Sequence, residues 1–169
     1  MNTTRLLRLP FAIAFLFLAT IFAQAQQTRT WLMLNLTSQE SFFVTDPAEH
    51  ASLTAAGWKT NGEGCLLATA DAKSAPLQRL VKSTDKGVDR LFAITPEQLS
   101  VATKDGYTNE GTLGQVSPKR QNAAMIPVYH FTQDARNLWL IDQADRAWAE
   151  KAGWKLKGVA FWLWPKGDA

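Results

Sequence analysis

The sequence predicts a mainly β fold with short helices, in the α+β class. Three repeats are expected to form a pseudo-three-fold, β-trefoil-like assembly. A glycine–aromatic segment that ends in a second glycine occurs three times, starting at Gly57, Gly106 and Gly153. Each copy follows a segment with helix-capping residues at both ends, and each of these segments follows short apolar strands. Repetition of this kind predicts an architecture in which similar units share one core.

Each repeat is expected to contain a strand, a strand, a helix and then two further strands separated at a glycine. The repeats cover about residues 31–69, 76–117 and 127–165. The second strand of each repeat occupies the same offset before the first glycine, at 42–44, 91–93 and 138–140. A unit of roughly 40 residues cannot bury its own apolar face, so the three units must pool their apolar sides.

The helices have start and stop signals. Each expected helix begins with a good N-cap, and the third residue after it can complete a capping box. The N-caps are Asp46, Thr95 and Asp142, and their capping partners are Glu49, Gln98 and Asp145. A glycine just after each helix favours a left-handed C-terminal cap, because glycine has no side chain to clash there.

The N-terminus predicts export. Residues 1–25 combine Arg5 and Arg8, an apolar run and the small residues Ala23 and Ala25, which is the pattern of a secretory signal peptide. The apolar run of about 13 residues is shorter than the roughly 20 that a membrane-spanning helix needs. We therefore expect a secreted or periplasmic product, cleaved near Ala25, with residues 26–169 as a single repeat domain and no membrane span.

Charge argues against nucleic acid as a partner. The whole chain has 18 Lys and Arg, 15 Asp and Glu and a formal net charge of +3. Loss of Arg5 and Arg8 with the signal peptide would leave 16 basic and 15 acidic residues, so the mature chain is nearly neutral. Beyond Lys119-Arg120, no basic run exists that could follow a phosphate backbone.

The residues that usually carry catalysis or bind metals are sparse. Cys65 is the single cysteine and stands beside Leu66 and Leu67, which favours a small buried apolar side chain over a reactive thiol. The two histidines, His50 and His130, have no cysteine or second histidine at a metal-ligand spacing. The sequence therefore predicts no catalytic residues, no metal site and no cofactor, and the protein is not expected to be an enzyme.

Several stretches resemble a known family. Residues 127–131 (PVYHF), 42–49 (FFVTDPAE) and 109–111 (NEG) resemble the repeat motifs of a family of secreted triple-repeat domains of unknown function, numbered 5648. The resemblance covers about residues 31–165. It implies an exported module that acts as a binding accessory more than as a catalyst, and it agrees with a β-trefoil-like fold with a helix inserted in each lobe.

The chain departs from this family at one motif. The family pattern has an Asp-His pair, whereas the three copies here have Glu40-Ser41, Asp89-Arg90 and Arg136-Asn137. If the pair builds a ligand or metal site in relatives, the resemblance implies that this site is altered here.

The aromatic residues give the best functional lead, because they gather in the third repeat. Alternation along residues 161–164 places Trp162 and Trp164 on the face opposite Phe161 and Leu163. One interpretation is a stacking platform for a sugar ring, formed by Trp162 and Trp164 with Trp148 as a third member. The alternative is that these rings cover the bottom of the barrel or contact the loop at 118–125.

Two functions follow from this pattern. The first is an exported, non-catalytic binding module that recognises glycan through surface aromatic residues. The second is a protein-interaction or envelope-associated structural domain, in which the same tryptophans contact a partner chain. A concave groove beside amide and carboxylate side chains would favour glycan, and a flat apolar patch would favour a protein partner.

Overall fold

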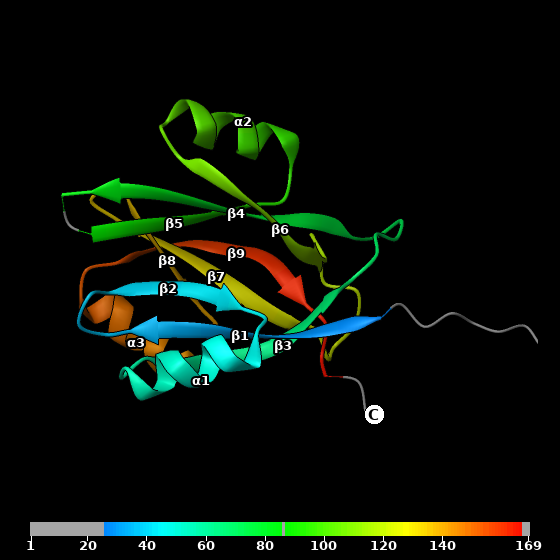
Figure 1. Cartoon of the computed structure of the whole chain (residues 1–169), viewed down its shortest axis with the longest axis horizontal. Helices are drawn as coiled ribbons and strands as arrows, with labels where there is room; N and C mark the ends of the chain where they lie inside the picture. The colour runs from blue at the N-terminus through cyan, green and yellow to red at the C-terminus, as the bar shows by residue number, and fades with distance from the viewer. Residues whose placement is uncertain (1–25, 86, 167–169) are drawn as a thin grey trace, which may run out of the picture.

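The chain folds into nine strands and three short helices, which confirms the expected mainly β class (Figure 1). The structure is a computed structural model that describes residues 26–85 and 87–166. The predicted signal peptide, residues 1–25, lies outside the described residues. In Figure 1 the helices lie outside the strands, with α2 at the top, α1 at the bottom and α3 at the left.

The chain passes three times through the order strand, strand, helix, strand. The first unit contains β1 (Gln27–Asn35), β2 (Glu40–Val44), α1 (Pro47–Ala55) and β3 (Lys59–Leu67). The second contains β4 (Ala75–Thr84), β5 (Gly87–Ala93), α2 (Pro96–Lys104) and β6 (Thr108–Val116). The third contains β7 (Ile126–Gln133), β8 (Arg136–Leu140), α3 (Gln143–Lys151) and β9 (Lys155–Leu163).

The prediction of two strands after each helix is wrong, because one continuous strand follows each helix. The second glycine of each copy lies inside that strand at a bulge, where the register shifts without ending the ladder. The pairing of β4 with β6 shifts twice, and so does that of β7 with β9, whereas β1 and β3 shift once. A bulge bends a strand and increases its twist, so the glycines bend these strands and do not separate them.

The three units have the same strand order, and they meet at the ends of their third strands. In each unit the first strand lies between the second and the third, as β2-β1-β3, β5-β4-β6 and β8-β7-β9. Leu67 of β3 pairs with Gln115 of β6. Bridges between Ser117 and Trp162 and between Cys65 and Trp164 then join the end of β9 to the second and first units. The three strand ends therefore close on one another.

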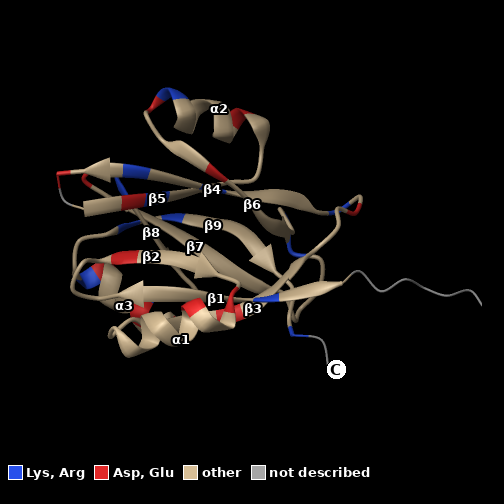
Figure 2. Cartoon of the chain, in the orientation of Figure 1, with Lys and Arg blue, Asp and Glu red and all other residues tan. Residues whose placement is uncertain are grey.

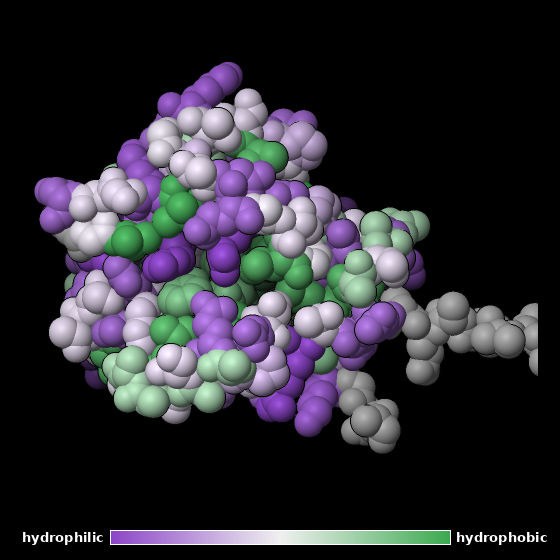
Figure 3. All heavy atoms as spheres, in the orientation of Figure 1, coloured by the Kyte–Doolittle hydropathy of each residue, from purple (hydrophilic) through white to green (hydrophobic). Residues whose placement is uncertain are grey.

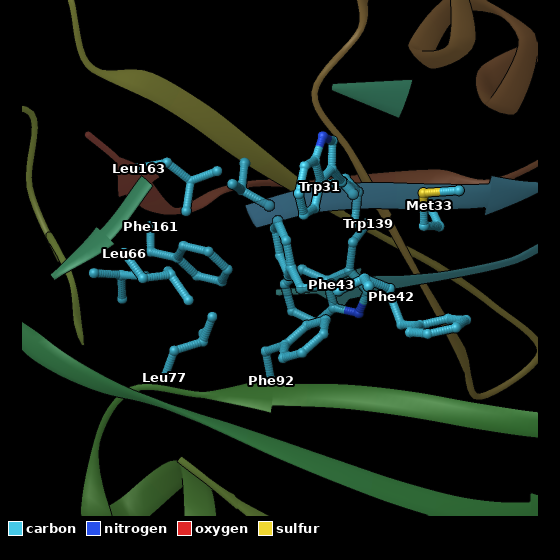
Figure 4. Packing of buried hydrophobic residues seen from close by; sticks show 14 residues of the cluster. Trp31, Met33, Phe42, Phe43, Leu66, Leu77, Phe92, Trp139, Phe161 and Leu163 are labelled. Carbon is cyan, nitrogen blue, oxygen red and sulfur yellow. The ribbon is translucent and has the colours of Figure 1, made fainter. Parts of the chain in front are cut away.

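The core lies where the second strands meet. Phe43 of β2, Phe92 of β5 and Trp139 of β8 occupy the same place in each unit, and all three contact Phe161 of β9, with ring centroids 6.0, 6.5 and 6.1 Å from its own (Figure 4). Phe43 and Phe92 also pack edge to face at 5.2 Å, a favourable arrangement for aromatic rings. A shared aromatic centre therefore holds the units together.

Two glycines make room for this centre. Gly64 pairs with Thr30 and Gly114 pairs with Leu77, at the places in β3 and β6 that correspond to Phe161 in β9. A Cβ atom on Gly64 would lie 2.8 Å from side-chain atoms of Leu163, and one on Gly114 would lie 2.8 Å from Leu66. Only one of the three corresponding positions can therefore hold a large side chain.

The capping residues act as expected, but only one helix has the full capping box. The side chains of Asp46, Thr95 and Asp142 each accept a hydrogen bond from the first turn of their helix. The reciprocal bond from the third residue is present only in α2, between Gln98 and the N-cap backbone. The capping boxes predicted for α1 and α3 are wrong. In α3 this is because the carboxylate of Asp145 bonds to another unit.

Candidate functional site

A cleft of about 400 Å³ lies between α2 and the third unit, and we call it the α2 cleft. Its walls come from all three strands of the third unit and from one face of α2 with the end of β5. The lining residues are Leu91, Phe92, Ile94, Glu97, Gln98, Val101, Ala102, Asp105, His130, Trp139, Ala160 and Phe161. The cleft therefore reaches from the surface to the aromatic centre of the molecule.

One row of side chains on α2 forms the outer wall. Glu97, Val101 and Asp105 follow one another at intervals of four residues, which places them on the same helix face. Val101 is 59% exposed, although it is a large apolar residue. An apolar side chain thus stands between two carboxylates on the rim of the cleft.

The start of α2 has its polar groups fixed by capping. The amide oxygen of Gln98 accepts from the backbone N–H groups of Ile94, at 2.8 Å, and Thr95, at 3.2 Å. The carboxylate of Glu97 has a lowered pKa, because its own backbone N–H and then the Thr95 hydroxyl donate to it. Glu97 therefore carries its negative charge at neutral pH, while Gln98 has its oxygen occupied.

His130 of β7 lines the opposite wall. Its imidazole lies parallel to the ring of Trp139, with centroids 4.2 Å apart and an angle of 5° between the planes. Its Nε2 atom lies 2.7 Å from Oδ1 of Asn137. Stacking and this hydrogen bond together hold the imidazole in one orientation beside the cleft.

A buried polar chain behind His130 fixes which of its nitrogens carries the proton. Asn137 donates from Nδ2 to Oδ2 of Asp89, at 2.8 Å, and to the hydroxyl of Tyr107, at 3.0 Å. The Tyr107 hydroxyl in turn donates to Asp89. Because the amide nitrogen of Asn137 is spent on these acceptors, its oxygen faces His130 and accepts from Nε2–H. Neutral His130 therefore presents Nδ1 as a hydrogen-bond acceptor.

Burial sets the protonation of this chain. Desolvation lowers the pKa of His130, and the hydrogen bond with Asn137 opposes this shift only in part. Desolvation and the neighbouring Asp89 carboxylate raise the pKa of Tyr107. At neutral pH the imidazole is therefore uncharged and the phenol keeps its proton.

The cleft is open at α2 because two residues there differ from those of α3. Val101 of α2 corresponds in position to Trp148 of α3, and the indole of Trp148 packs against a core cluster of the third unit. Gln98 corresponds to Asp145, whose carboxylate accepts from the ammonium of Lys59 and the amide of Asn61, both at 2.7 Å. Since Gln98 is folded back into its capping box, no such link to the next unit forms at α2 among the described residues.

The face of the molecule that Figure 3 shows has hydrophobic residues near its middle, with hydrophilic residues around and between them. In the α2 cleft the polar groups are two carboxylates, an imidazole acceptor and an amide. This combination suits a ligand that has an apolar body and at least one hydrogen-bond donor.

Trp162 and Trp164 lie at the end of β9, away from the α2 cleft. Phe161 and Leu163 are buried, whereas Trp162 and Trp164 are half-buried, which confirms the expected alternation. The backbone of Trp162 bonds to Ser117, at 2.8 and 2.9 Å. The guanidinium of Arg120 lies 5.5 Å from the ring centroid of Trp162. The loop that carries Arg120 thus contacts Trp162, as in the alternative given above, and ligand binding by this pair stays a prediction.

Trp148 lies on α3 and belongs to a different cluster of side chains from the other two tryptophans. It packs against the buried residues Leu34, Phe131, Leu138, Leu140, Ala149 and Trp154. Neither Trp162 nor Trp164 is in that cluster. The structure therefore does not bring Trp148 together with Trp162 and Trp164.

The residues at the altered Asp-His motif link neighbouring units. Glu40 of the first unit accepts from the backbone N–H of Val88, at 3.2 Å. Asp89 of the second unit accepts from the backbone N–H of Asn137, at 2.7 Å. Arg136 of the third unit donates to the carbonyl of Ser38, at 2.8 Å, and so returns to the first unit. In this chain the first residue of each pair contacts the next unit.

Cys65 is buried, as expected for a small apolar side chain. Among the described residues, no group of three or more His, Cys, Asp or Glu side chains is arranged to hold a metal ion. No helix in the described part of the chain has the length and apolarity that crossing a membrane requires.

Sequence reasoning missed the α2 cleft. Its lining is drawn from two units that lie far apart in the chain, and most of the residues are ordinary apolar side chains. An available signal was Val101, an apolar residue between Glu97 and Asp105. It lies on a different face of α2 from Leu99 and Ala102, which pack in the core.

Comparison with known families gives one match. The model of the family described as "Domain of unknown function (DUF5648)" matches residues 29–164. The chain belongs to the DUF5648 family. This confirms the resemblance drawn from the repeat motifs. Comparisons with curated proteins and with solved structures found no match.

Within this DUF5648 chain, the buried carboxylate of Asp89 should be important for stability. Asp89 is 2% exposed, and Asp89→Ala would leave two donors of Asn137 and the Tyr107 hydroxyl without their acceptor. We expect a loss of about 2–4 kcal/mol in the free energy of unfolding, measured by urea denaturation. Asp85→Ala, in the exposed turn of the same hairpin, is the control and should change it by less than about 0.5 kcal/mol. Equal effects of the two variants would contradict the assignment.

The lowered pKa of His130 predicts a pH dependence of stability. As the pH falls from 7.5 to 5.5, the unfolded chain takes up a proton near the usual pKa of 6.5, whereas the folded chain resists it. Stability is therefore full above that pKa and falls below it, by at most about 1.4 kcal/mol per pH unit for this group. His130→Gln should flatten the curve of unfolding free energy against pH in this range. An unchanged slope in His130→Gln would exclude His130 as its source.

Proposed function

We propose that the mature chain is an exported, non-catalytic binding module whose ligand site is the α2 cleft. The observation that carries the proposal is the cleft itself, which reaches from the surface to the aromatic centre and has acceptor groups on both walls. Its volume of about 400 Å³ falls within the range of about 300–1,000 Å³ that is usual for small-molecule sites. Export rests on the signal-peptide pattern of residues 1–25.

The lining favours a compact, apolar ligand over a sugar. The aromatic side chains at the bottom of the cleft are almost fully covered, and Trp139 is only 2% exposed. Most of the accessible apolar area must therefore come from aliphatic groups such as Val101, Ile94 and Ala160. A sugar needs an exposed ring face on which to stack, and the cleft offers few.

We further propose that the three units are related by an approximate three-fold axis in a β-trefoil-like assembly. Phe43, Phe92 and Trp139 lie at the same place in each unit and surround one residue, Phe161. The bridges between units also join β3 to the end of β6, the end of β6 to β9, and β9 back to β3, which is a cyclic order. An axis of this kind would place three related inter-unit grooves around the molecule, and the differences at Val101 and Gln98 would leave the α2 groove open.

Filling the cleft should abolish binding there. Val101→Trp gives α2 the residue that α3 has at Trp148, and the indole would occupy the space of the ligand. We expect benzyl alcohol and benzylammonium, used as probes, to shift the amide NMR signals of residues such as His130 and Ala160 in the native chain. The variant should lose these shifts.

Ser52→Trp is the matched control, since Ser52 has the corresponding, exposed place on α1. It should keep the shifts. If no probe shifts the signals of cleft residues in the native chain, the proposed site is wrong.

A second candidate function, glycan recognition, is favoured by the half-buried rings of Trp162 and Trp164 on one face of β9. A second cavity, of about 390 Å³, lies beside Ser117, the backbone partner of Trp162, and its lining includes Lys73, Ser74 and Gln121 of the neighbouring loops. Partly exposed indoles next to amide and hydroxyl groups are suited to sugar rings.

Glycan recognition predicts that Trp164→Ala loses retention on a glycan array while its melting temperature changes little. Trp148→Ala is the comparison, since Trp148 lies on α3 in a different cluster of side chains, and it should keep retention. Intrinsic tryptophan fluorescence reports whether each variant is folded. Retention that survives in folded Trp164→Ala would exclude this surface as a glycan site.

A further inference from the structure

The ionisable groups that line the α2 cleft are unevenly distributed in sign. Glu97 and Asp105 contribute carboxylates and His130 contributes an imidazole, whereas no lysine or arginine is among the lining residues in the described parts of the chain. A cleft with anionic groups at its rim and low-dielectric walls concentrates cations. The charge of the lining can therefore define the class of ligand.

We propose that the ligand of the α2 cleft is a small organic cation, with an apolar body about the size of a benzene ring and an ammonium group. This inference rests on the proposed function of the cleft and specifies its ligand. The apolar body contacts Val101, Ile94 and Ala160, and the ammonium group lies at the rim.

The two carboxylates are placed at opposite ends of the helix. Eight residues separate Glu97 from Asp105, which corresponds to about 12 Å along a helix axis. Figure 2 shows acidic residues near both ends of α2. Both residues are exposed, so each can meet the ammonium without a large desolvation cost. The ammonium group of a ligand shorter than the cleft can therefore lie beside either of the two carboxylates.

His130, on the wall of the cleft opposite α2, also suits a ligand that donates a hydrogen bond. His130 presents Nδ1 as an acceptor, because its Nε2 is bonded to Asn137. The amide oxygen of Gln98 is already occupied by backbone N–H groups. An ammonium N–H can donate to Nδ1, whereas a carboxylate ligand would place its lone pairs against those of the imidazole.

Lys157 of β9 is a nearby positive group that acts against this preference, and so is Lys82, whose ammonium donates to the backbone carbonyl of Asp105 at 2.7 Å. The charge of Lys157 contributes to the lowered pKa of His130, although Lys157 does not line the cleft. Its removal should therefore strengthen cation binding, which gives the proposal a variant whose effect has the opposite sign.

The other candidate surface has the opposite charge. Arg120 lies over Trp162, and Lys73 and Lys119 line the second cavity nearby. A cation is repelled there, so the two surfaces should discriminate between ligands by charge.

The test compares three probes that share one ring and differ in charge: benzylammonium, benzyl alcohol and benzoate. Each is titrated into the mature chain at low salt, and binding is followed by the amide NMR shifts of cleft residues. We expect benzylammonium to bind at least about threefold more tightly than benzyl alcohol, and benzoate to bind most weakly. Addition of 0.5 M NaCl should reduce the difference, because salt screens exposed charges.

Charge variants identify the groups responsible. Glu97→Gln and Asp105→Asn should each weaken benzylammonium by about two- to threefold, the size expected for one exposed charge, and leave benzyl alcohol unchanged. Lys157→Met should strengthen benzylammonium. Glu49→Gln is the control, because it removes a charge from the first turn of α1, outside the cleft, and should change neither probe.

The outcomes separate the two proposals. Benzoate or benzyl alcohol binding in the cleft as tightly as benzylammonium would overturn the cationic ligand and keep the cleft as a binding site. A failure of all three probes to shift cleft residues would overturn the cleft itself. Loss of benzylammonium binding in Glu49→Gln equal to that in Glu97→Gln would show that net charge, and not the cleft, is responsible.

Discussion

The packing of three aromatic side chains around Phe161 is the interaction on which the rest of the structure depends. Phe43, Phe92 and Trp139 come from three different units, and each brings its own hairpin to the centre. Phe161 contacts a ring from each of the three hairpins, so the relative positions of the hairpins and of the α2 cleft depend on this packing, together with the hydrogen bonds between units. Protein interiors are close-packed, which is why the corresponding places in β3 and β6 hold glycine and not a second large residue.

Polar groups define how neighbouring units are aligned. Aromatic packing alone is not strongly directional, whereas hydrogen bonds to buried groups are costly to leave unmade. Asp89 satisfies the backbone and the amide of Asn137 in the next unit, and Asn137 in turn orients His130 at the cleft. The same buried chain therefore stabilises an interface and sets the direction of a hydrogen-bond acceptor at the candidate site. A change at Asp89 would reach the cleft through Asn137.

The residues at corresponding helix positions differ between the units, and α2 has a cleft beside it. The residue at one helix position is Ser52 in α1, Val101 in α2 and Trp148 in α3. Trp148 of α3 packs against a core cluster that includes Leu34 and Phe131, and Asp145 links that helix to β3. At α2 the smaller Val101 leaves space, and Gln98 serves only its own helix. Similar backbones thus present different surfaces, which is the usual route by which function is placed on a fold.

Local sequence determined the elements of this protein. The caps at Asp46 and Thr95 and the glycines after the helices define each helix through backbone chemistry that acts over a few residues. The alternation of Phe161 and Trp162 likewise follows from the two-residue period of a strand. The continuation of each strand through the second glycine was not predictable from the sequence. A bulge and the end of a strand have the same local sequence pattern, and only the partner strand distinguishes them.

Tertiary structure decided the site. The α2 cleft joins Val101 to His130 and Ala160, and Trp148 packs in a cluster that does not contain Trp162. Contacts of this kind depend on how three units pack, and no spacing along the chain records that packing. The sequence by itself determined the capped helices, the alternating strands and the family, because these follow from short-range chemistry and repeated motifs. Only the folded molecule decided where the α2 cleft lies, since that depends on side-chain volume and charge across an interface between distant segments.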